Sequence, residues 1–432
     1  MAILQIIENP EKHRWPSLLK RPVLQAENLD NTVREILEAI KKGGDEALNS
    51  YSVQFEQSAI SDRIVSKKEF EEAEGKLGED LKKAIRQAKI NIEAFHSNQL
   101  APEAEVEVMA GIRCWRKAVA IERVGLYIPG GTAPLFSTLL MLGVPARLAG
   151  CKEIIVCTPP QPDGSIHPAI LYTAALLGIR RLIKAGGAQA IAAMAFGTET
   201  IPKVYKIFGP GNQYVTHAKK IIQQEGIAID MPAGPSELAV YADESAIPEF
   251  VAADLLSQCE HGTDSQVILV TSSRGFAEAV NAALELQIES LPRKSIALKS
   301  LENSKMFLLK DPGVAMDLLN EYSPEHLILA CRNPEIYSTG VRNAGSVFLG
   351  NYAPESAGDY ASGTNHTLPT NGFARAYSGV SVDSFVKKIS FQQLTRNGLQ
   401  SISNTVTEMA RAEGLQAHAA AVEIRFSTPK TQ

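Results

Sequence analysis

The sequence predicts an α/β protein with two doubly wound parallel-sheet domains and small helical extensions at its N- and C-terminal ends. Short apolar strand patterns alternate with alanine-rich helical patterns from residue 113 onward, and a second such series starts near residue 237. Continuous apolar strands that alternate with helices are typical of parallel sheets covered on both faces. With 432 residues, the chain is long enough for about two to four domains.

The composition favours a globular protein. Hydrophobic residues make up 45% of the chain and charged residues 21%, which excludes a disordered or collagen-like chain. No apolar run approaches the ~20 residues that span a bilayer, and the first residues do not resemble a secretory signal. The net charge of -5 comes without a basic segment, so we expect neither a nucleic-acid nor a membrane partner. Five cysteines without a CxxC pair fit reduced thiols and a cytoplasmic location.

The N-terminal part is predicted to be helical. Apolar residues recur at helical spacing over residues 28–56, with Asp30 or Asn31 as a cap and the glycine pair at 43–44 as a stop. A second helical pattern covers residues 67–98, and its alternating Glu and Lys residues are typical of a solvated face.

Strands and helices then alternate along the chain. The first series has strand patterns in residues 118–129, 153–160, 181–186 and 206–212, separated by helical patterns in 137–150, 169–178 and 188–197. The second series has strand patterns in 238–243, 265–273 and 343–350 and a helical pattern in 248–262. The last fifty residues are predicted to form a helical module with a terminal strand in residues 421–426.

These patterns divide the chain into four parts. In chain order we expect an N-terminal arm (1–22), an α/β domain made of 23–112 together with 237–381, a second α/β domain (113–236) and a C-terminal helical module (382–432). No low-complexity linker separates these parts, so the domains are expected to pack closely rather than swing on a tether.

Three predicted strands of the first series end in glycine-rich loops, at residues 127–131, 185–189 and 209–212. Ligands of parallel sheets bind beyond the carboxyl ends of the strands, and glycine lets the backbone approach a phosphate closely. Three such loops favour a nucleotide site, although the glycines of any one loop are also explained by a tight turn. The GxGxxG fingerprint of dinucleotide-binding folds and the GxxxxGK[ST] motif are both absent.

Ionisable residues gather in the second half of the chain. Gln258 and His261 are three apart and share one face near the end of a helix. Glu325 and His326 are adjacent in a loop that contains Pro324. Further candidates are Glu355, Asp359 and His366 in the polar loop 351–370, and Glu413 and His418 near the C-terminus. Nitrogen and oxygen ligands of this kind suit Zn²⁺ with an open position for substrate or water.

The residues alone favour a metal-assisted α/β enzyme and leave three functions open. A dehydrogenase would use the glycine-rich loops to bind a dinucleotide. A zinc hydrolase of an amino-acid-like amide or ester would use Glu325 to activate a zinc-bound water and would need no nucleotide. A non-catalytic nucleotide-binding module that regulates a partner would leave the histidines of the second half, which are His261, His326, His366 and His418, without a function. Dependence of turnover on a nicotinamide cofactor separates the first two functions.

Several sequence blocks, taken in order, resemble the histidinol dehydrogenase family. They are RVGLYIPGG, APLFST, GGAQAIAAMAFG, KIFGPGN, DMPAGPSE, DLLSQCEHG, SPEHL, AGSVFLG and ESAGDYASGTNHTLPT. Enzymes of this family oxidise L-histidinol through the aldehyde to L-histidine with two NAD⁺, which is the last step of histidine biosynthesis. The resemblance spans about residues 118–418. It implies two Rossmann-like domains, NAD⁺-dependent oxidation of a primary alcohol and then of its aldehyde, one Zn²⁺ per subunit, and a homodimer with shared active sites.

The matching motifs also imply roles for individual residues. The catalytic acid–base pair is matched by Glu325 and His326. The zinc ligands are matched by Gln258, His261, Asp359 and His418. Contacts with L-histidinol are matched by these four ligands together with Ser236, His326, His366 and Glu413. Positions that hold NAD⁺ are matched by Tyr127, Gln189 and Asn212. In the family's dimer the C-terminal module reaches the partner, so Glu413 and His418 would serve the partner's site.

These implied roles fit the chemistry of the side chains. A histidine with an ordinary pKa of about 6.5 suits removal of the hydroxyl proton, which is the role expected of His326. A neighbouring carboxylate, Glu325, suits activation of the water that adds to the aldehyde. Because the GxGxxG turn is missing, we expect NAD⁺ to bind with modest affinity in the absence of substrate.

Overall fold

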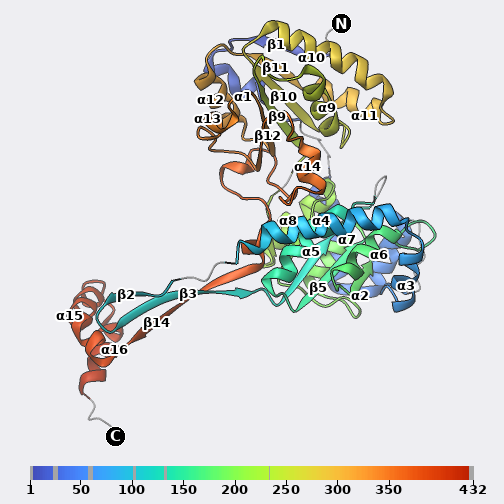
Figure 1. Ribbon diagram of the computed structural model, residues 1–432. Coiled ribbons are helices and arrows are strands. Elements are labelled where there is room, and N and C mark those ends of the chain that lie inside the picture. The colour runs from blue at the N-terminus through green and yellow to red at the C-terminus, as the bar shows by residue number, and fades with distance from the viewer. Residues whose placement is uncertain are drawn as a thin grey trace. The chain divides into compact units, whose positions relative to one another are not determined.

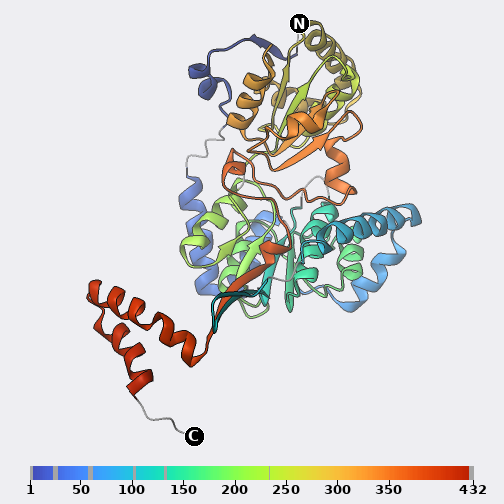
Figure 2. The same cartoon turned by 60° about the vertical axis from the view of Figure 1, so that its left-hand side comes forward.

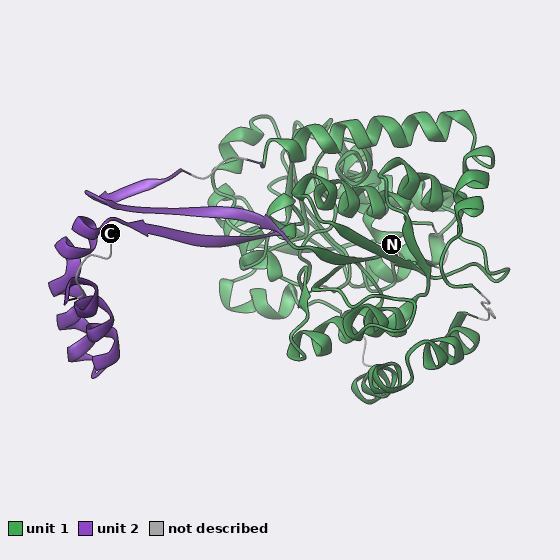
Figure 3. Cartoon of the chain, turned by 90° about the horizontal axis from the view of Figure 1, so that it is seen from below, with its two compact units in different colours: residues 1–99, 121–385 green, residues 100–120, 386–432 purple. Residues whose placement is uncertain are grey.

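The computed structural model describes residues 3–22, 28–56, 62–100, 104–130, 134–232 and 234–427. It divides into two compact units (Figure 3). Unit 1 comprises residues 1–99 and 121–385, and unit 2 comprises residues 100–120 and 386–432. Unit 1 contains two parallel sheets, so the predicted pair of doubly wound α/β layers is confirmed.

The first of these, the β4 sheet, has five parallel strands. Their spatial order is β6 (Arg181–Lys184), β5 (Glu153–Thr158), β4 (Arg123–Tyr127), β7 (Lys206–Phe208) and β8 (Ala228–Ile229). One face is covered by α3 (Lys67–Gly75), α4 (Glu79–Ser97), α5 (Phe136–Ala149) and α6 (Pro168–Leu176). The other face is covered by α2 (Leu29–Glu56), α7 (Gly187–Phe196) and α8 (Gln213–Gln224). Alternate strand residues enter the two cores, as the period of a pleated strand requires.

The second, the β9 sheet, has six parallel strands. It lies near the N-terminus of the chain, as Figures 1 and 2 show. Their order is β1 (Gln5–Glu8), β11 (Lys305–Leu308), β10 (Gln266–Thr271), β9 (Glu237–Ala242), β12 (His326–Ala330) and β13 (Ser346–Leu349). One face packs against α9 (Pro248–Cys259), α10 (Arg274–Gln287) and α11 (Lys294–Glu302). The other packs against α1 (Trp15–Leu18), α12 (Pro312–Tyr322) and α13 (Pro334–Ser338). When the strands of each sheet are numbered by their order in the chain, and β1 is left out, both sheets have the spatial order 3-2-1-4-5. This is the order of the first five strands of a dinucleotide-binding fold.

The helices of residues 29–97 pack against the β4 sheet, whereas the sequence analysis assigned residues 23–112 to the domain of residues 237–381. The apolar stripe of α2, which includes Val33, Ile36 and Ile40, is buried against α7 and α8. An amphipathic stripe requires burial but does not specify the sheet that buries it. The predicted N-terminal arm adds β1 to the edge of the β9 sheet. The glycine pair bends α2 rather than ending it, because Gly44 has a φ of +50° inside a helix that continues to Glu56.

Unit 2 combines a three-stranded antiparallel sheet with two helices. The sheet order is β14 (Val386–Leu394), β3 (Ile112–Ala120) and β2 (Val106–Met109), and the helices α15 (Arg396–Ala412) and α16 (Gln416–Ser427) pack against each other. The terminal strand predicted in residues 421–426 is wrong, because these residues continue the alanine-rich helix α16. Strand β14 lies instead before the two helices.

Short elements complete the described chain. They are α14 (Glu355–Tyr360) and the 3₁₀ turns Lys12–Arg14, Ile288–Ser290, Phe373–Arg375 and Val382–Phe385. Among the helices of the described residues, none combines the length and the apolar character needed to cross a bilayer.

The two parallel sheets carry their polar loops at opposite edges. The glycine-rich loops predicted from the sequence follow β4, β6 and β7, at the carboxyl edge of the β4 sheet. Glu325 and Ser236 instead precede β12 and β9, at the amino edge of the β9 sheet. The ionisable cluster therefore departs from the usual rule that parallel sheets bind ligands at their carboxyl edge.

Gly209 lies in the loop after β7, where the backbone packs directly against the end of β4. Its φ is +126°, and a Cβ atom there would overlap the carbonyl oxygen of Tyr127. We expect Gly209→Ala to lose about 3 kcal/mol or more of stability. Gly226→Ala is the matched control, because Gly226 also has a positive φ, of +87°, but has open space around it and should lose about 1 kcal/mol. Scanning calorimetry measures both, and equal losses would contradict this account.

Candidate active site

The adjacent pair Glu325 and His326 lies at the start of β12 and is almost completely buried. Ser323 ends α12 in the left-handed region with a φ of +52°, and Pro324 follows it, so the chain turns sharply into β12. The exposed fraction is 6% for Glu325 and 3% for His326. A buried carboxyl group beside a buried imidazole needs specific partners, because each loses its hydration.

The backbone of Glu237, on the neighbouring strand β9, supplies partners to both residues. Its N–H donates to Glu325 Oε2 at 2.9 Å, and its carbonyl oxygen lies 3.3 Å from His326 Nδ1. Because a carbonyl oxygen can only accept, Nδ1 carries a proton in this hydrogen bond. The other ring nitrogen, Nε2, lies 3.4 Å from Asp359 Oδ1.

The side chain of Glu237 is held by an arginine from the N-terminal arm. Arg21 pairs with both of its carboxylate oxygens, with Nη2 at 2.8 Å from Oε2, and its guanidinium lies 4.3 Å from the ring centroid of Tyr322. The backbone N–H of Asn371 donates to the same carboxylate at 2.7 Å. Burial still raises the pKa of Glu237, although Arg21 opposes the shift. This ion pair fixes the segment whose backbone holds the catalytic candidates.

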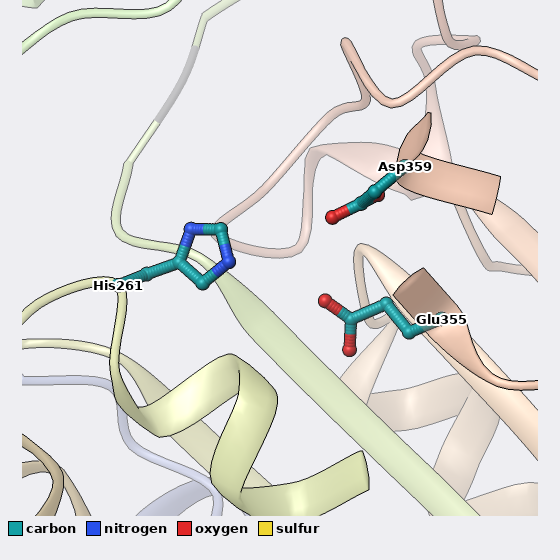
Figure 4. A group of neighbouring side chains, drawn as sticks. All are labelled: His261, Glu355 and Asp359. Atoms are coloured by element: carbon teal, nitrogen blue, oxygen red, sulfur yellow. The ribbon is translucent and has the colours of Figure 1, made fainter. Parts of the chain in front are cut away.

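A group of possible metal ligands, drawn in Figure 4, lies beside His326. Glu355 and Asp359 are one helical turn apart on α14, and His261 follows the end of α9. Their ligand atoms all lie within 4.8 Å of one another. Nitrogen and carboxylate oxygen donors at such separations suit a divalent cation such as Zn²⁺.

The electrostatics of the cluster also fit a cation. Burial raises the pKa of Glu325 to about 8 and that of Glu355 to about 8. Burial by itself lowers the pKa of His326, but Glu355, Glu325 and Asp359 outweigh it and raise the pKa to about 10. Among the described residues, Asp359 Oδ1 is buried without a well-formed hydrogen bond. The cluster thus has more buried carboxyl groups than positive charges, and its donor atoms fit the zinc ion expected from the sequence.

The other residues predicted at this site divide between the two units. In unit 1, Gln258 is fully buried on α9 with its amide beside Glu355, and in the amide orientation that satisfies both groups its nitrogen donates to this carboxylate. His366 is also in unit 1; its Nδ1 lies 2.8 Å from the carbonyl oxygen of Asp359 and its Nε2 lies 3.2 Å from Thr138 Oγ1. Ser236 immediately precedes β9 and is partly buried. Two predicted residues, Glu413 and His418, lie in unit 2 and are exposed.

Glu355 was not assigned a role by the sequence analysis. The segment around it was interpreted as a polar loop, whereas residues 355–360 form a helix that places Glu355 and Asp359 on one face. Their spacing of four residues is the signal that identifies Glu355 as a neighbour of the predicted ligand Asp359.

The residues predicted to hold NAD⁺ lie at the carboxyl edge of the β4 sheet and make internal hydrogen bonds. The Tyr127 hydroxyl accepts from the N–H of Gly187 at 3.0 Å, and the Gln189 amide donates to Glu56 at 3.3 Å. Asn212 caps α8 by accepting from two backbone N–H groups. Each side chain therefore has a structural role in the loop that carries it.

Two sheets of dinucleotide-binding order, with an acid–imidazole pair beside a candidate metal site, define this chain as an α/β enzyme of the oxidoreductase class. Comparison with known proteins identifies the group within that class. The chain belongs to the histidinol dehydrogenase family, whose model matches residues 19–426. This confirms the resemblance and the oxidoreductase function expected from the sequence.

The relatives are similar over nearly their whole length. The chain is 56% identical to a histidinol dehydrogenase from Bacteroides thetaiotaomicron, covering 99% of this chain and 100% of the relative. It is 50% identical to a histidinol dehydrogenase from Yersinia pestis, covering 95% of this chain and 93% of the relative. The crystal structure of histidinol dehydrogenase from Elizabethkingia anophelis matches with a TM-score of 0.97 and 54% identity, covering 99% of each chain.

The ion pair between Arg21 and Glu237 generates a stability prediction. Arg21→Met leaves a buried carboxylate without its partner and should cost about 3–5 kcal/mol. The double variant Arg21→Met with Glu237→Gln should recover most of this loss, because no charge remains buried. Chemical denaturation measures these differences.

Arg34→Met is the control for this prediction, because Arg34 forms a similar ion pair with Asp30 on the exposed surface. It should cost less than about 1 kcal/mol. Equal losses from the Arg21 and Arg34 variants would show that the buried pair does not hold this segment.

Proposed function

We propose that the protein catalyses the four-electron oxidation of L-histidinol, through L-histidinal, to L-histidine with two NAD⁺. The observation that carries this proposal is the placement of His326 and Glu325 beside His261 and Asp359 at the amino edge of the β9 sheet. The family of the chain supports the substrate. A zinc hydrolase is not favoured, because it has no need of the second, glycine-rich sheet edge. The proposal includes the cytoplasmic location expected from the sequence.

One Zn²⁺ per subunit is proposed to be held by Gln258, His261, Asp359 and His418 of the partner subunit. Two observations support this set: the donors are nitrogen and oxygen atoms, and Asp359 Oδ1 is buried without a well-formed hydrogen bond among the described residues. A zinc ion held by these residues would supply the positive charge that the acidic cluster lacks and would give the nitrogen atoms of the substrate a binding point. Ser236, His366 and Glu413 are proposed as further substrate contacts.

The chain's own residues account for the proton transfers. His326 accepts the hydroxyl proton of the alcohol while the hydride leaves, and its ring is oriented by the carbonyl oxygen of Glu237. This role needs the neutral imidazole, which a cation held by Asp359 would favour, because its charge would offset the carboxylates that raise the pKa of His326. Glu325 accepts a proton from the water that adds to the aldehyde, and His326 returns its proton to the aldehyde oxygen, which gives a gem-diol. Loss of a second hydride and two protons from the gem-diol yields the carboxylate. NAD⁺ accepts one hydride in each oxidation.

NAD⁺ is proposed to bind at the carboxyl edge of the β4 sheet, near Tyr127, Gln189 and Asn212. These side chains already bond to their own loops, and the GxGxxG turn is absent. Both observations support modest affinity for NAD⁺ in the absence of substrate, because few unpaired polar groups are in place to bind the dinucleotide.

The protein is proposed to act as a homodimer in which unit 2 completes the partner's site. Exposed apolar side chains on unit 2 support the homodimer, because a contiguous apolar surface on a protein usually marks a site where another protein packs. They include Val106 and Val108 on β2 (54% and 56% exposed) and Ile424 on α16 (60%). Glu413 and His418 are exposed on the same unit.

The function is tested by NADH formation from L-histidinol and NAD⁺. We expect two NADH per histidinol, loss of activity with a chelator and recovery with Zn²⁺. His326→Asn should lower kcat by about 10²–10⁴-fold. Glu325→Gln should reduce the yield toward one NADH per histidinol, because only hydration of the aldehyde is impaired. No NADH under any metal condition would contradict the proposed function.

Sharing of the site between subunits is tested by co-expressing His326→Asn with His418→Asn, each inactive alone. If His418 serves the partner, a mixed dimer has one intact site, and random pairing gives about a quarter of the native activity. If His418 serves its own subunit, every site in the mixture carries a substitution. Activity would then stay at the level of the single variants.

A further inference from the structure

We propose that Glu355 is a positioning residue that orients the amide of Gln258 for metal binding. This inference rests on the proposed zinc enzyme and extends it to a residue outside the predicted ligand set. It concerns the choice between the two ends of an amide, which have the same shape but opposite hydrogen-bonding character.

The contact between these two side chains is buried and specific. Gln258 is 0% exposed on α9, and Glu355 is 2% exposed at the start of α14. In the orientation that satisfies the amide, its nitrogen donates to the two carboxylate oxygens of Glu355 at 2.7 and 3.2 Å. When Glu355 is ionised, the reverse orientation would place the amide oxygen against two acceptors, so the carboxylate selects one orientation.

Orientation matters because only one end of an amide is a good ligand for zinc. With Nε2 bound to Glu355, Oε1 points away from this carboxylate and is free to act as a donor to a cation. Residues that hold a metal ligand in place in this way usually change metal affinity strongly when they are replaced.

Glu355 itself is close enough to be considered as a ligand, because it belongs to the group formed with His261 and Asp359. The two carboxylates of α14 differ, however, in their hydrogen bonds. In this amide orientation both oxygens of Glu355 accept from Gln258, whereas Asp359 Oδ1 is buried without a well-formed hydrogen bond to any described residue. This difference assigns Asp359 to the metal and Glu355 to the amide.

A double-mutant cycle on the full chain tests the assignment, with Zn²⁺ affinity measured by competition with a chelator. Glu355→Met removes the acceptor at similar size and should weaken Zn²⁺ binding about 10–100-fold. Glu355→Gln should give an intermediate loss, because its amide oxygen can still accept. In a Gln258→Ala background, Glu355→Met should change the affinity less than about 3-fold, because there is no amide left to orient.

Controls separate this role from a general effect on folding. Glu249 is exposed on α9, the helix that also carries Gln258, so Glu249→Met should leave Zn²⁺ affinity unchanged. Thermal unfolding without metal should show no loss of stability for Glu355→Gln, because that variant removes a buried carboxyl group from an acidic cluster. If Glu355→Met prevents folding, Glu355→Gln takes its place in the cycle.

The outcomes are distinguishable. An equal loss of affinity in both backgrounds would make Glu355 a ligand and overturn the inference, as would no loss in either background. If the native protein binds no Zn²⁺ at all, the proposed zinc enzyme itself fails.

Discussion

The structure depends on one electrostatic constraint, which is the burial of several carboxyl groups around the imidazole of His326 at the amino edge of the β9 sheet. Glu325, Glu355 and His326 are each less than 10% exposed, and Asp359 lies 3.4 Å from the imidazole. Such a group is costly unless charge and hydrogen bonds compensate it. The chain supplies part of the compensation through the backbone of Glu237. A divalent cation beside His261 would supply the rest, which is why we regard the cluster as a metal site.

The two sheets contribute to this site in different ways. The β9 sheet carries the acid–imidazole pair, and Arg21 fixes its neighbouring segment through a buried ion pair. The β4 sheet reaches the same region through α5, where Thr138 contacts His366 and the carbonyl oxygen of Met141 accepts from Asn365. The loop that contains His366 and Asn365 therefore joins the group of possible metal ligands to the half of unit 1 in which NAD⁺ is proposed to bind.

Much of this architecture could be predicted from the sequence, because apolar strand runs and glycine-rich loops are local signals. The partner of an amphipathic helix is not local, which explains why residues 29–97 pack against a different sheet from the one expected. The alanine-rich end of the chain was predicted as a strand from its short apolar run, although its helix propensity prevails. At the site, adjacent or motif-borne residues such as Glu325 and His326 were identifiable. Glu355 was named as a candidate in the polar loop, but its role was not predicted, because that role depends on a contact with Gln258 from a distant helix.

The most direct test of the central claim is X-ray diffraction at the zinc absorption edge, from crystals of the full chain grown with Zn²⁺. We expect one anomalous peak, about 2.0–2.2 Å from the amide oxygen of Gln258, a ring nitrogen of His261 and a carboxylate oxygen of Asp359. The amide nitrogen of Gln258 should then face Glu355. A metal bound by Glu355 with the amide turned away, or bound at other side chains, would contradict the account.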